Sequence, residues 1–457
     1  MAAERSPRAD WLPRLGLFGC VAAAYVTALG GPFQFDDHGV IVRETSVHDL
    51  GAFFGAASAS LRPLLKLSYA LCWALSPASW PFHLFNLLIH LVNVELVLRL
   101  YSAAFEPKLS WPFGSRAPGG SLAALLFALH PLQTEAITYI SGRSASLATS
   151  FALVALLFHA AGARSGRTLF SAVLTPLAFV AAVLTKETTA ILALAFVAWD
   201  LIIERRSFRQ AAWRFLPWVL LGIALLGLAI MQGRYFALLY SALGQRALGD
   251  SLRYQLSGVA YLVKRLLFLE PLCIDPALQL VAPPGTLVAV AAASMGAVCL
   301  LAARFARRWP LLAFGVFWFV LHTFVPYVLV PRADVINERH AYLANAGLFI
   351  GLASLWCEVR PRVREPWQFA LWVALTLGLG ALTLRRNRDY RSEIALWQST
   401  VRAAPHNPRA FNNLGVAFES SHRYAEARNA YARALVLEPR YATARKNLER
   451  SMRQPLR

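Results

Sequence analysis

The chain has 457 residues, of which 57% are hydrophobic and 15% are charged. Soluble globular domains carry about 25% charged residues. Because the apolar residues also gather into long runs, the composition excludes a soluble globule and predicts an all-α polytopic membrane bundle. The net charge of +20 does not predict binding to nucleic acid, because much of the basic charge lies in short loops between the apolar runs. There it sets the orientation of the helices or binds anionic lipid headgroups and lipid-linked phosphates.

Apolar runs follow one another along the chain, and about 20 such residues cross a bilayer as a helix. The first run has no small-residue cleavage site, so we expect it to be retained as a helix rather than removed as a signal. The runs predict about eleven transmembrane helices, at 11–31, 81–101, 119–140, 144–163, 168–185, 187–203, 213–232, 284–304, 309–330, 340–357 and 366–384.

Arginine-rich loops predict the orientation of these helices, because short loops rich in Lys and Arg stay in the cytoplasm. They place the N-terminus inside, and they place residues 36–37, residues 234–283 and the C-terminus outside. The loops are at 164–167, 204–214, 304–308 and 360–364.

Two segments need a separate interpretation. The apolar piece 256–269 carries Lys264 and Arg265, which favours a helix at the membrane interface over a crossing. Three arginines at 385–388 follow the last run on the side assigned as outside. They disagree with the predicted orientation.

Two adjacent carboxylates, Asp36 and Asp37, follow the first apolar run. Like charges repel, and the repulsion separates their proton affinities, so one acts as a base while its neighbour orients it or holds a proton. A simple helix cap is the alternative, and the pair alone does not decide between them. Binding of a divalent cation by the pair and a histidine also stays open.

Polar residues at membrane depth are costly and therefore informative. His83 shares a helix face with two further polar residues, where hydrogen bonds across the bundle explain each one better than metal binding. His130 precedes a proline that breaks a helix, and a broken helix lines a cavity rather than lipid. Glu135 and Arg143 then approach the outer surface.

The predicted orientation gathers further charges at the outer face: Lys186, Glu187, Lys264, Arg265, Glu338 and Arg339. This layout suits a site where Lys and Arg hold a phosphate-bearing lipid while a carboxylate acts on its sugar. For any single Lys or Arg, reaching to the lipid headgroups is the alternative.

The composition changes near the end, which predicts a membrane domain at 1–388 and a helical module at 389–457. Small and aromatic residues there have the spacing of one tetratricopeptide repeat, with Gly415, Ala427 and Ala434 at the crossing of two helices. One and a half repeats bury little core. We therefore expect the module to pack against the membrane domain or a protein partner.

A set of short motifs occurs in a fixed order along nearly the whole chain. They are Phe35-Asp36-Asp37-His38, Arg62-Pro63-Leu64, His83…Asn86…His90, Ala128-Leu129-His130-Pro131…Glu135-Ala136, Ser141-Gly142-Arg143, Lys186-Glu187, Asn337-Glu338-Arg339…Tyr342-Leu343 and Arg386-Asn387…Trp397. In this order the chain resembles the GT-C superfamily of polyprenyl-phosphate-sugar-dependent glycosyltransferases, especially the transmembrane-and-TPR-containing O-mannosyltransferases.

The resemblance implies a helical bundle with an outer cavity, a catalytic acidic pair, and a polyprenyl- or dolichyl-phosphate monosaccharide as donor. We expect Asp36 to be the base and Asp37 to position it or the acceptor. The donor phosphate is expected at Arg143, Lys186, Lys264, Arg265 and Arg339, and the cavity lining at Arg62, His83, His130, Glu135, Glu187 and Glu338.

An inverting glycosyltransferase is the expected activity, with mannose as the sugar that the resemblance suggests. The expected acceptor is a hydroxyl of a protein Ser or Thr, a lipid or a glycan on the periplasmic or luminal face of a bacterial inner membrane or an ER membrane. The single repeat departs from the long arrays of the animal members. That departure leaves recognition of a protein acceptor open and suggests a bacterial or otherwise minimal member.

Two other classes remain as alternatives. A transporter or flippase of lipid-linked sugars predicts two halves with matching hydropathy, which the sequence does not show. A non-catalytic scaffold that recruits partners through its repeat leaves the buried His, Glu and Arg residues unexplained. The absence of a glycine-rich nucleotide loop fits a lipid-linked donor.

Overall fold

The computed structural model describes residues 11–105, 118–231, 233–269, 271–280 and 282–455, so the basic segment before the first helix lies outside the described part. Every regular element within these ranges is a helix. The predicted all-α fold class is confirmed.

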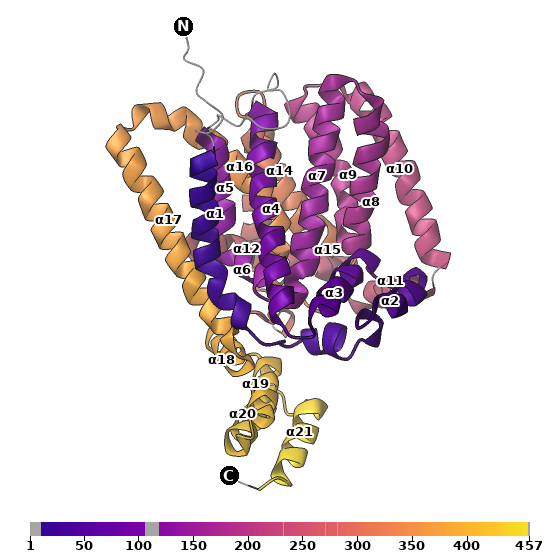
Figure 1. Cartoon of the computed structure of the whole chain (residues 1–457), viewed down its shortest axis with the longest axis vertical. Helices are drawn as coiled ribbons and strands as arrows, with labels where there is room; N and C mark the ends of the chain where they lie inside the picture. The colour runs from indigo at the N-terminus through magenta and orange to yellow at the C-terminus, as the bar shows by residue number, and fades with distance from the viewer. Residues whose placement is uncertain (1–10, 106–117, 232, 270, 281, 456–457) are drawn as a thin grey trace.

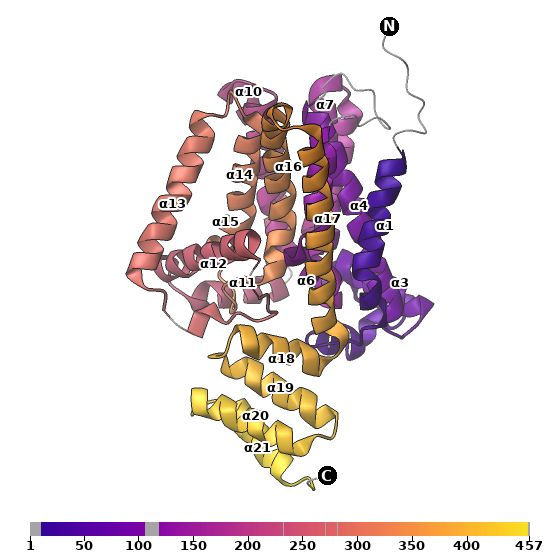
Figure 2. The ribbon, with the colours of Figure 1, turned by 90° about the vertical axis from the view of Figure 1, so that its left-hand side faces the viewer.

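Upright helices form the main bundle in the described part of the chain (Figures 1 and 2), and each predicted apolar run overlaps one of them. Six helical segments there are long and apolar enough to cross a membrane, and four further apolar helices are shorter. The chain is therefore an integral membrane protein. The upright helices are α1 (Trp11–Tyr25), α4 (Trp80–Phe105), α5 (Pro118–Leu129), α7 (Arg143–Ser165), α8 (Thr175–Thr185), α9 (Leu192–Ala198), α10 (Phe208–Met231), α13 (Gly285–Arg304), α14 (Pro310–Thr323), α16 (Ala341–Val359) and α17 (Glu365–Asn387).

Glycines allow α14 and α16 to approach closely at the centre of the bundle. A Cβ atom on Gly315 would lie 2.4 Å from the carbonyl oxygen of Gly347. A Cβ atom on Gly347 would lie equally close to the Trp318 ring. Small residues at such crossings are how membrane helices gain packing contacts. The close pairing fixes the ends of α14 and α16 relative to each other.

Contacts between loops show which of them share one end of the bundle. Arg164 forms an ion pair with Glu204 at 2.9 Å, and Arg205 donates to the carbonyl oxygen of Arg307 at 3.2 Å. Three of the four predicted cytoplasmic loops therefore meet at one end. Figures 1 and 2 show α1 beginning at that end and finishing beside the C-terminal helices at the other.

Short helices cover the end of the bundle near the C-terminus. Figure 2 shows α12 lying across the upright helices rather than parallel to them, as expected for the interfacial piece 256–269. Arg386, one of the arginines that disagreed with the predicted orientation, is buried and paired with Glu338 and Asp389. It is therefore not a free loop charge of the kind that sets orientation. Besides the longer α12 (Leu248–Phe268), the short helices are α2 (Leu50–Ala56), α3 (Pro63–Leu75), α6 (Thr134–Ile137), α11 (Gly233–Gln245) and α15 (Val325–Leu329).

Four helices stack below this end: α18 (Glu393–Ala403), α19 (Pro408–Ser420), α20 (Tyr424–Leu437) and α21 (Ala442–Met452) (Figure 2). A Cβ atom on Gly415 would lie 2.5 Å from the Tyr431 ring, so only glycine permits this crossing of α19 and α20. Ala427 and Ala434 are fully buried in α20. We call α18–α21 the C-terminal module.

Ion pairs join the C-terminal module to the membrane bundle. Arg409 of α19 donates to both carboxylate oxygens of Asp275, at 2.6 and 2.7 Å, and to Asp334 at 2.6 Å. The Asp275 side chain is only 3% exposed. The Asn407 side chain donates to the carbonyl oxygen of Asp275 at 3.0 Å. One arginine thus links the module to two loops of the membrane bundle.

Replacing Arg409 with methionine should lower the free energy of unfolding by about 1–3 kcal/mol, because the buried Asp275 carboxylate loses its partner. Thermal unfolding of purified protein in detergent measures this change. Arg453→Met, which removes an exposed arginine from the same module, is the control and should leave the midpoint unchanged. Equal midpoints for the two variants would contradict the assignment.

Candidate functional site

Residues 31–37, which we call the acidic loop, follow α1 and hold the two carboxylates in different surroundings. Asp37 is buried, whereas Asp36 is exposed. The Asp37 carboxylate accepts hydrogen bonds from the Gln34 amide at 3.0 Å and the Ser141 amide at 2.8 Å, and from the Ser141 hydroxyl. Among the described residues, the Asp36 carboxylate has no hydrogen-bond or ion-pair partner. Asp37 is fixed in place, and Asp36 is open to a substrate.

The C-terminal module and a tyrosine hold the acidic loop in place. Phe35 adopts a left-handed backbone conformation (φ 49°), which a non-glycine residue keeps only where its surroundings enforce it. Its amide donates to Glu393 at 2.8 Å, and its ring packs edge-on against Trp397 with centroids 5.0 Å apart. The next amide, that of Asp36, donates to the Tyr139 hydroxyl at 3.0 Å.

Burial raises the pKa of the Asp37 carboxyl from 3.8 to about 7, an effect that the bonds from Ser141 and Gln34 partly offset and the neighbouring Asp36 charge increases. Between about pH 4 and pH 7 the folded protein therefore holds a proton that the unfolded chain has released. The free energy of unfolding must fall as the pH rises through this window.

Asp37→Asn removes that titration, so its stability relative to the wild type should increase from pH 4.5 to pH 7 and then level off. Thermal unfolding midpoints measured across this range check the prediction. Asp49→Asn, at an exposed helix cap, is the control and should follow the wild-type curve. Parallel curves for the wild type and Asp37→Asn would refute the raised pKa.

The helix α5 ends before His130, as the sequence predicts, and the turn that follows brings Glu135 close to Arg339. His130 Nδ1 accepts from the Leu132 amide at 3.2 Å, and its Nε2 lies 3.2 Å from the carbonyl oxygen of Leu266 in α12. The chain then turns into α6, where the buried Glu135 carboxylate accepts from the Arg339 amide at 2.9 Å and from the Arg339 guanidinium. Glu135 therefore positions Arg339.

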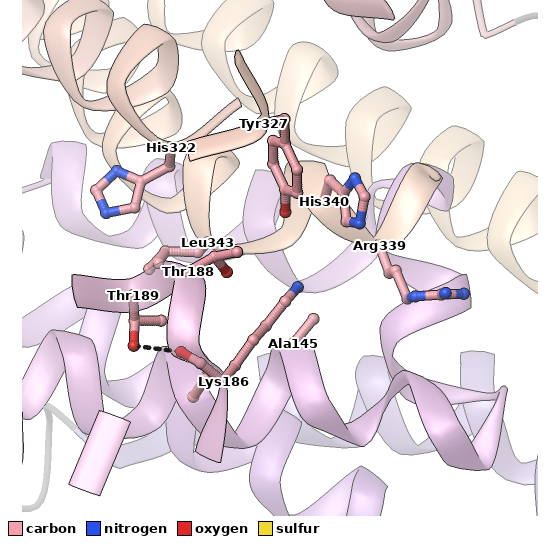
Figure 3. A pocket seen from close by; sticks show the side chains of 10 residues that line it. Ala145, Lys186, Thr188, Thr189, His322, Tyr327, Arg339, His340 and Leu343 are labelled. Carbon is pink, nitrogen blue, oxygen red and sulfur yellow. Dashed lines mark hydrogen bonds between the residues drawn. The ribbon is translucent and has the colours of Figure 1, made fainter. Parts of the chain in front are cut away.

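Lys186 and Arg339 line a small cavity of about 20 Å³ (Figure 3), which we call the Lys186 cavity. Lys186 lies between α8 and a short turn at 187–191, and its ammonium has no hydrogen-bond or ion-pair partner among the described residues. The remaining lining residues are Ala145, Ala148, Thr188, Thr189, His322, Tyr327, His340 and Leu343.

Further charges surround the Lys186 cavity. Arg62 makes a bidentate ion pair with the Glu187 carboxylate, at 2.8 and 2.7 Å, and Arg332 donates to the same carboxylate. These arginines and Arg339 add to burial in lowering the pKa of Lys186 well below its usual range, while Glu187 opposes them. A buried cation among cations is stabilised by an anion. The charges around the Lys186 cavity therefore favour an anion.

Tyr139 connects the acidic loop to the Lys186 cavity. Its hydroxyl accepts from the Asp36 amide, and the Arg339 guanidinium carbon lies 5.8 Å from the centre of its ring. Tyr139 thus lies between the acidic loop and Arg339, which also lines the Lys186 cavity.

Other residues that were predicted for the site do not line the Lys186 cavity. Arg143 is fully buried and donates to Asn86 Oδ1 at 2.6 Å and to the carbonyl oxygens of Phe82 and Ser68. Its guanidinium is thus used in joining helices and does not reach the Lys186 cavity. His83 lies 3.1 Å from the carbonyl oxygen of Gly31, at the start of the acidic loop.

α12 and the buried Glu338 also lie apart from the Lys186 cavity lining. Lys264 is exposed on α12, and Arg265 lines a second, mostly apolar cavity of about 370 Å³ between α12, α13 and the turn after α18. Glu338 accepts from the Cys273 amide at 2.7 Å and from the Tyr261 hydroxyl at 3.1 Å. Within the described residues, no three His, Cys, Asp or Glu side chains gather closely enough to hold a metal ion.

Four residues near the site were not among the predicted site residues: Arg332, His322, Tyr327 and His340. The only feature of the sequence that pointed to Arg332 is its position five residues before Asn337, in a segment predicted to lie outside. The other three lie within or beside apolar runs. Their gathering depends on the crossing of α14 and α16, which the sequence did not reveal.

The chain is similar to several curated proteins named protein O-mannosyl-transferase, two of which match it over more than 90% of its length. The protein O-mannosyl-transferase F38B6.6 of Caenorhabditis elegans is 24% identical over 91% of the chain and 61% of its own length. The protein O-mannosyl-transferase TMTC3 of Homo sapiens is 23% identical over 95% of the chain and 52% of its own length. The human protein O-mannosyl-transferase TMTC4 is 34% identical over 158 residues, 30% of the chain.

The chain spans about half to three fifths of the length of the first two of these relatives. No family model and no solved structure matches it. The predicted resemblance is nevertheless confirmed: over more than 90% of its length, the chain is a distant homologue of the TMTC protein O-mannosyl-transferases.

Proposed function

We propose that the chain is a GT-C-type, membrane-embedded inverting glycosyltransferase that uses a polyprenyl-phosphate-linked sugar. The proposal includes eleven crossings, a site on the periplasmic or luminal face, and the C-terminal module, a TPR-like unit, on that same face. The observation that carries it is the connection, through Tyr139, between an exposed carboxylate, Asp36, and the cavity of a buried ammonium, Lys186, neither paired within the described structure.

The chemistry needs one base and one anion site. An acceptor hydroxyl oxygen attacks the anomeric carbon of the sugar, and the bond from that carbon to the phosphate oxygen breaks. The hydroxyl proton passes to Asp36, while polyprenyl phosphate leaves with the electron pair and is held by Lys186 and Arg339. General-base help contributes about 10²–10⁴-fold, and cations at the leaving phosphate supply electrostatic stabilisation.

The names of the relatives support mannose as the sugar and a protein hydroxyl as the acceptor. The position of the C-terminal module beside the acidic loop supports an acceptor that approaches from the water-facing side. Asp37, which accepts hydrogen bonds from Ser141, holds the acidic loop in its conformation, and Glu135 holds Arg339 at the cavity.

A transfer assay with purified protein in lipid nanodiscs tests the proposal. Radiolabelled polyprenyl-phosphate mannose and GDP-mannose are each offered with Ser- and Thr-containing peptides and cell-envelope acceptors. Transfer from the lipid-linked donor alone is the expected result. No transfer to any acceptor, or transfer from the nucleotide sugar alone, would overturn the proposal.

A further inference from the structure

Residues 386–397, which contain the last of the sequence motifs, lie against the acidic loop. The Gln34 side chain donates to the carbonyl oxygen of Tyr390 at 2.6 Å, and both residues are buried. The Phe35 amide donates to the Glu393 carboxylate at 2.8 Å. The two residues that come immediately before the exposed carboxylate are therefore held by this segment.

The segment 386–397 is itself fixed to the membrane bundle. The Asn387 side chain, only 2% exposed, donates to the carbonyl oxygen of Ala24 at 2.6 Å and accepts from the Thr138 hydroxyl at 2.5 Å. Figure 2 shows α17 descending to this end of the bundle and leading into α18, which begins at Glu393. The Glu393 carboxylate is thus presented to the acidic loop from an anchored helix, the kind of support that holds a reacting group precisely.

Glu393 contacts the acidic loop and its continuation on both sides of Asp36. Besides the Phe35 amide, the same carboxylate oxygen lies 3.2 Å from His38 Nε2. Phe35 keeps a left-handed backbone (φ 49°), which a non-glycine residue adopts only under constraint, and the buried Trp397 ring packs against it. Because the Asp36 carboxylate has no hydrogen-bond or ion-pair partner among the described residues, the backbone of the loop sets its direction.

We propose that Glu393 is the positioning residue for the base. It fixes the conformation of Phe35 and thereby the direction in which Asp36 presents its carboxylate to the acceptor hydroxyl. The C-terminal module, through α18, is then part of the catalytic unit as well as a water-facing surface. This inference rests on the proposed function and adds to it the residue that aligns the base.

Transfer kinetics of Glu393 variants test the inference, with polyprenyl-phosphate mannose as donor and a Ser- and Thr-containing peptide as acceptor in lipid nanodiscs. Glu393→Ala should lower kcat about 10- to 100-fold, because a small misplacement of a reacting group costs this much. The KM for the donor should stay the same, since the Lys186 cavity is untouched. Glu393→Gln keeps an oxygen that accepts from the Phe35 amide and should restore most of the rate. It also loses the charge in the first turn of α18, so it separates the hydrogen bond from the helix charge.

Hydrogen exchange of the backbone amides, followed by mass spectrometry, reports on the acidic loop without any reaction. In Glu393→Ala, residues 33–38 should exchange about 10- to 100-fold faster, the factor that corresponds to one hydrogen bond to a charged group. In Glu393→Gln these residues should exchange nearly as slowly as in the wild type. Unchanged exchange in α4 and α7 would report that the bundle of each variant is intact.

Glu449→Ala is the matched control, because it removes an exposed glutamate from α21 of the same module. It should leave both kcat and the exchange of the acidic loop unchanged. A wild-type kcat in Glu393→Ala would overturn the inference, and so would a lowered kcat with unchanged exchange of residues 33–38. A Glu393→Gln variant as slow as Glu393→Ala would also overturn it. A wild type that transfers no mannose from the lipid donor would instead overturn the proposed function, whatever the exchange data show.

Discussion

Replacing Asp36 with asparagine should lower kcat by about 10²–10⁴-fold while leaving the KM for the lipid donor nearly unchanged. Asparagine has nearly the same shape but cannot take the proton of the acceptor hydroxyl, and general-base help has this magnitude. The backbone amide that binds Tyr139 is retained, so the acidic loop should keep its conformation. Steady-state transfer rates with polyprenyl-phosphate mannose measure the effect.

Two variants separate this role from a general effect of charge. Asp49→Asn, an exposed helix cap that lies after the acidic loop, should transfer sugar at the wild-type rate. Asp37→Asn keeps an oxygen to accept from Ser141, so its rate should exceed that of Asp36→Asn. If Asp37→Asn were the slower of the two, the roles of the two carboxylates would be reversed.

Lys186→Met should give the second large effect, a loss of about 10²–10³-fold in kcat/KM, the magnitude seen when one group that stabilises developing charge is removed. Methionine preserves most of the packing of the long side chain. It removes the only described cavity-lining ammonium. Kinetics over a range of donor concentrations provide the measurement, and Lys446→Met, at an exposed position on α21, is the control.

The pH dependence gives a further check on Lys186. Its pKa is lowered mainly by burial, and the donor phosphate binds the charged form. Donor binding should therefore weaken as the pH rises in the wild type, and this dependence should be absent in Lys186→Met. A Lys186→Met variant with wild-type kcat/KM would exclude Lys186 from the phosphate site.

Hydropathy was enough to locate the upright helices, because about 20 apolar residues in a row have few other stable forms. The gathering of Asp36, Glu135, Lys186 and Arg339 at one end followed from counting crossings and basic loops. These predictions depend on local composition, which the sequence displays directly.

Side-chain partners were not predictable in the same way. Arg143 belongs to a plausible motif, but its neighbours come from two other helices, α3 and α4, and they occupy its guanidinium. Glu338 likewise appeared to be a cavity acid and instead ties α12 to α17. His322 carries no local signal at all, because its contact with the Lys186 cavity depends on the glycine-mediated crossing of α14 and α16.

The anomeric configuration of the product tests the central claim most directly. A single carboxylate that activates the acceptor hydroxyl for one displacement at the anomeric carbon must invert that carbon. With a β-linked polyprenyl-phosphate mannose as donor, NMR of the purified product should show an α-linked mannose. A β-linked product would mean two displacements and would contradict the assignment of Asp36 as a general base.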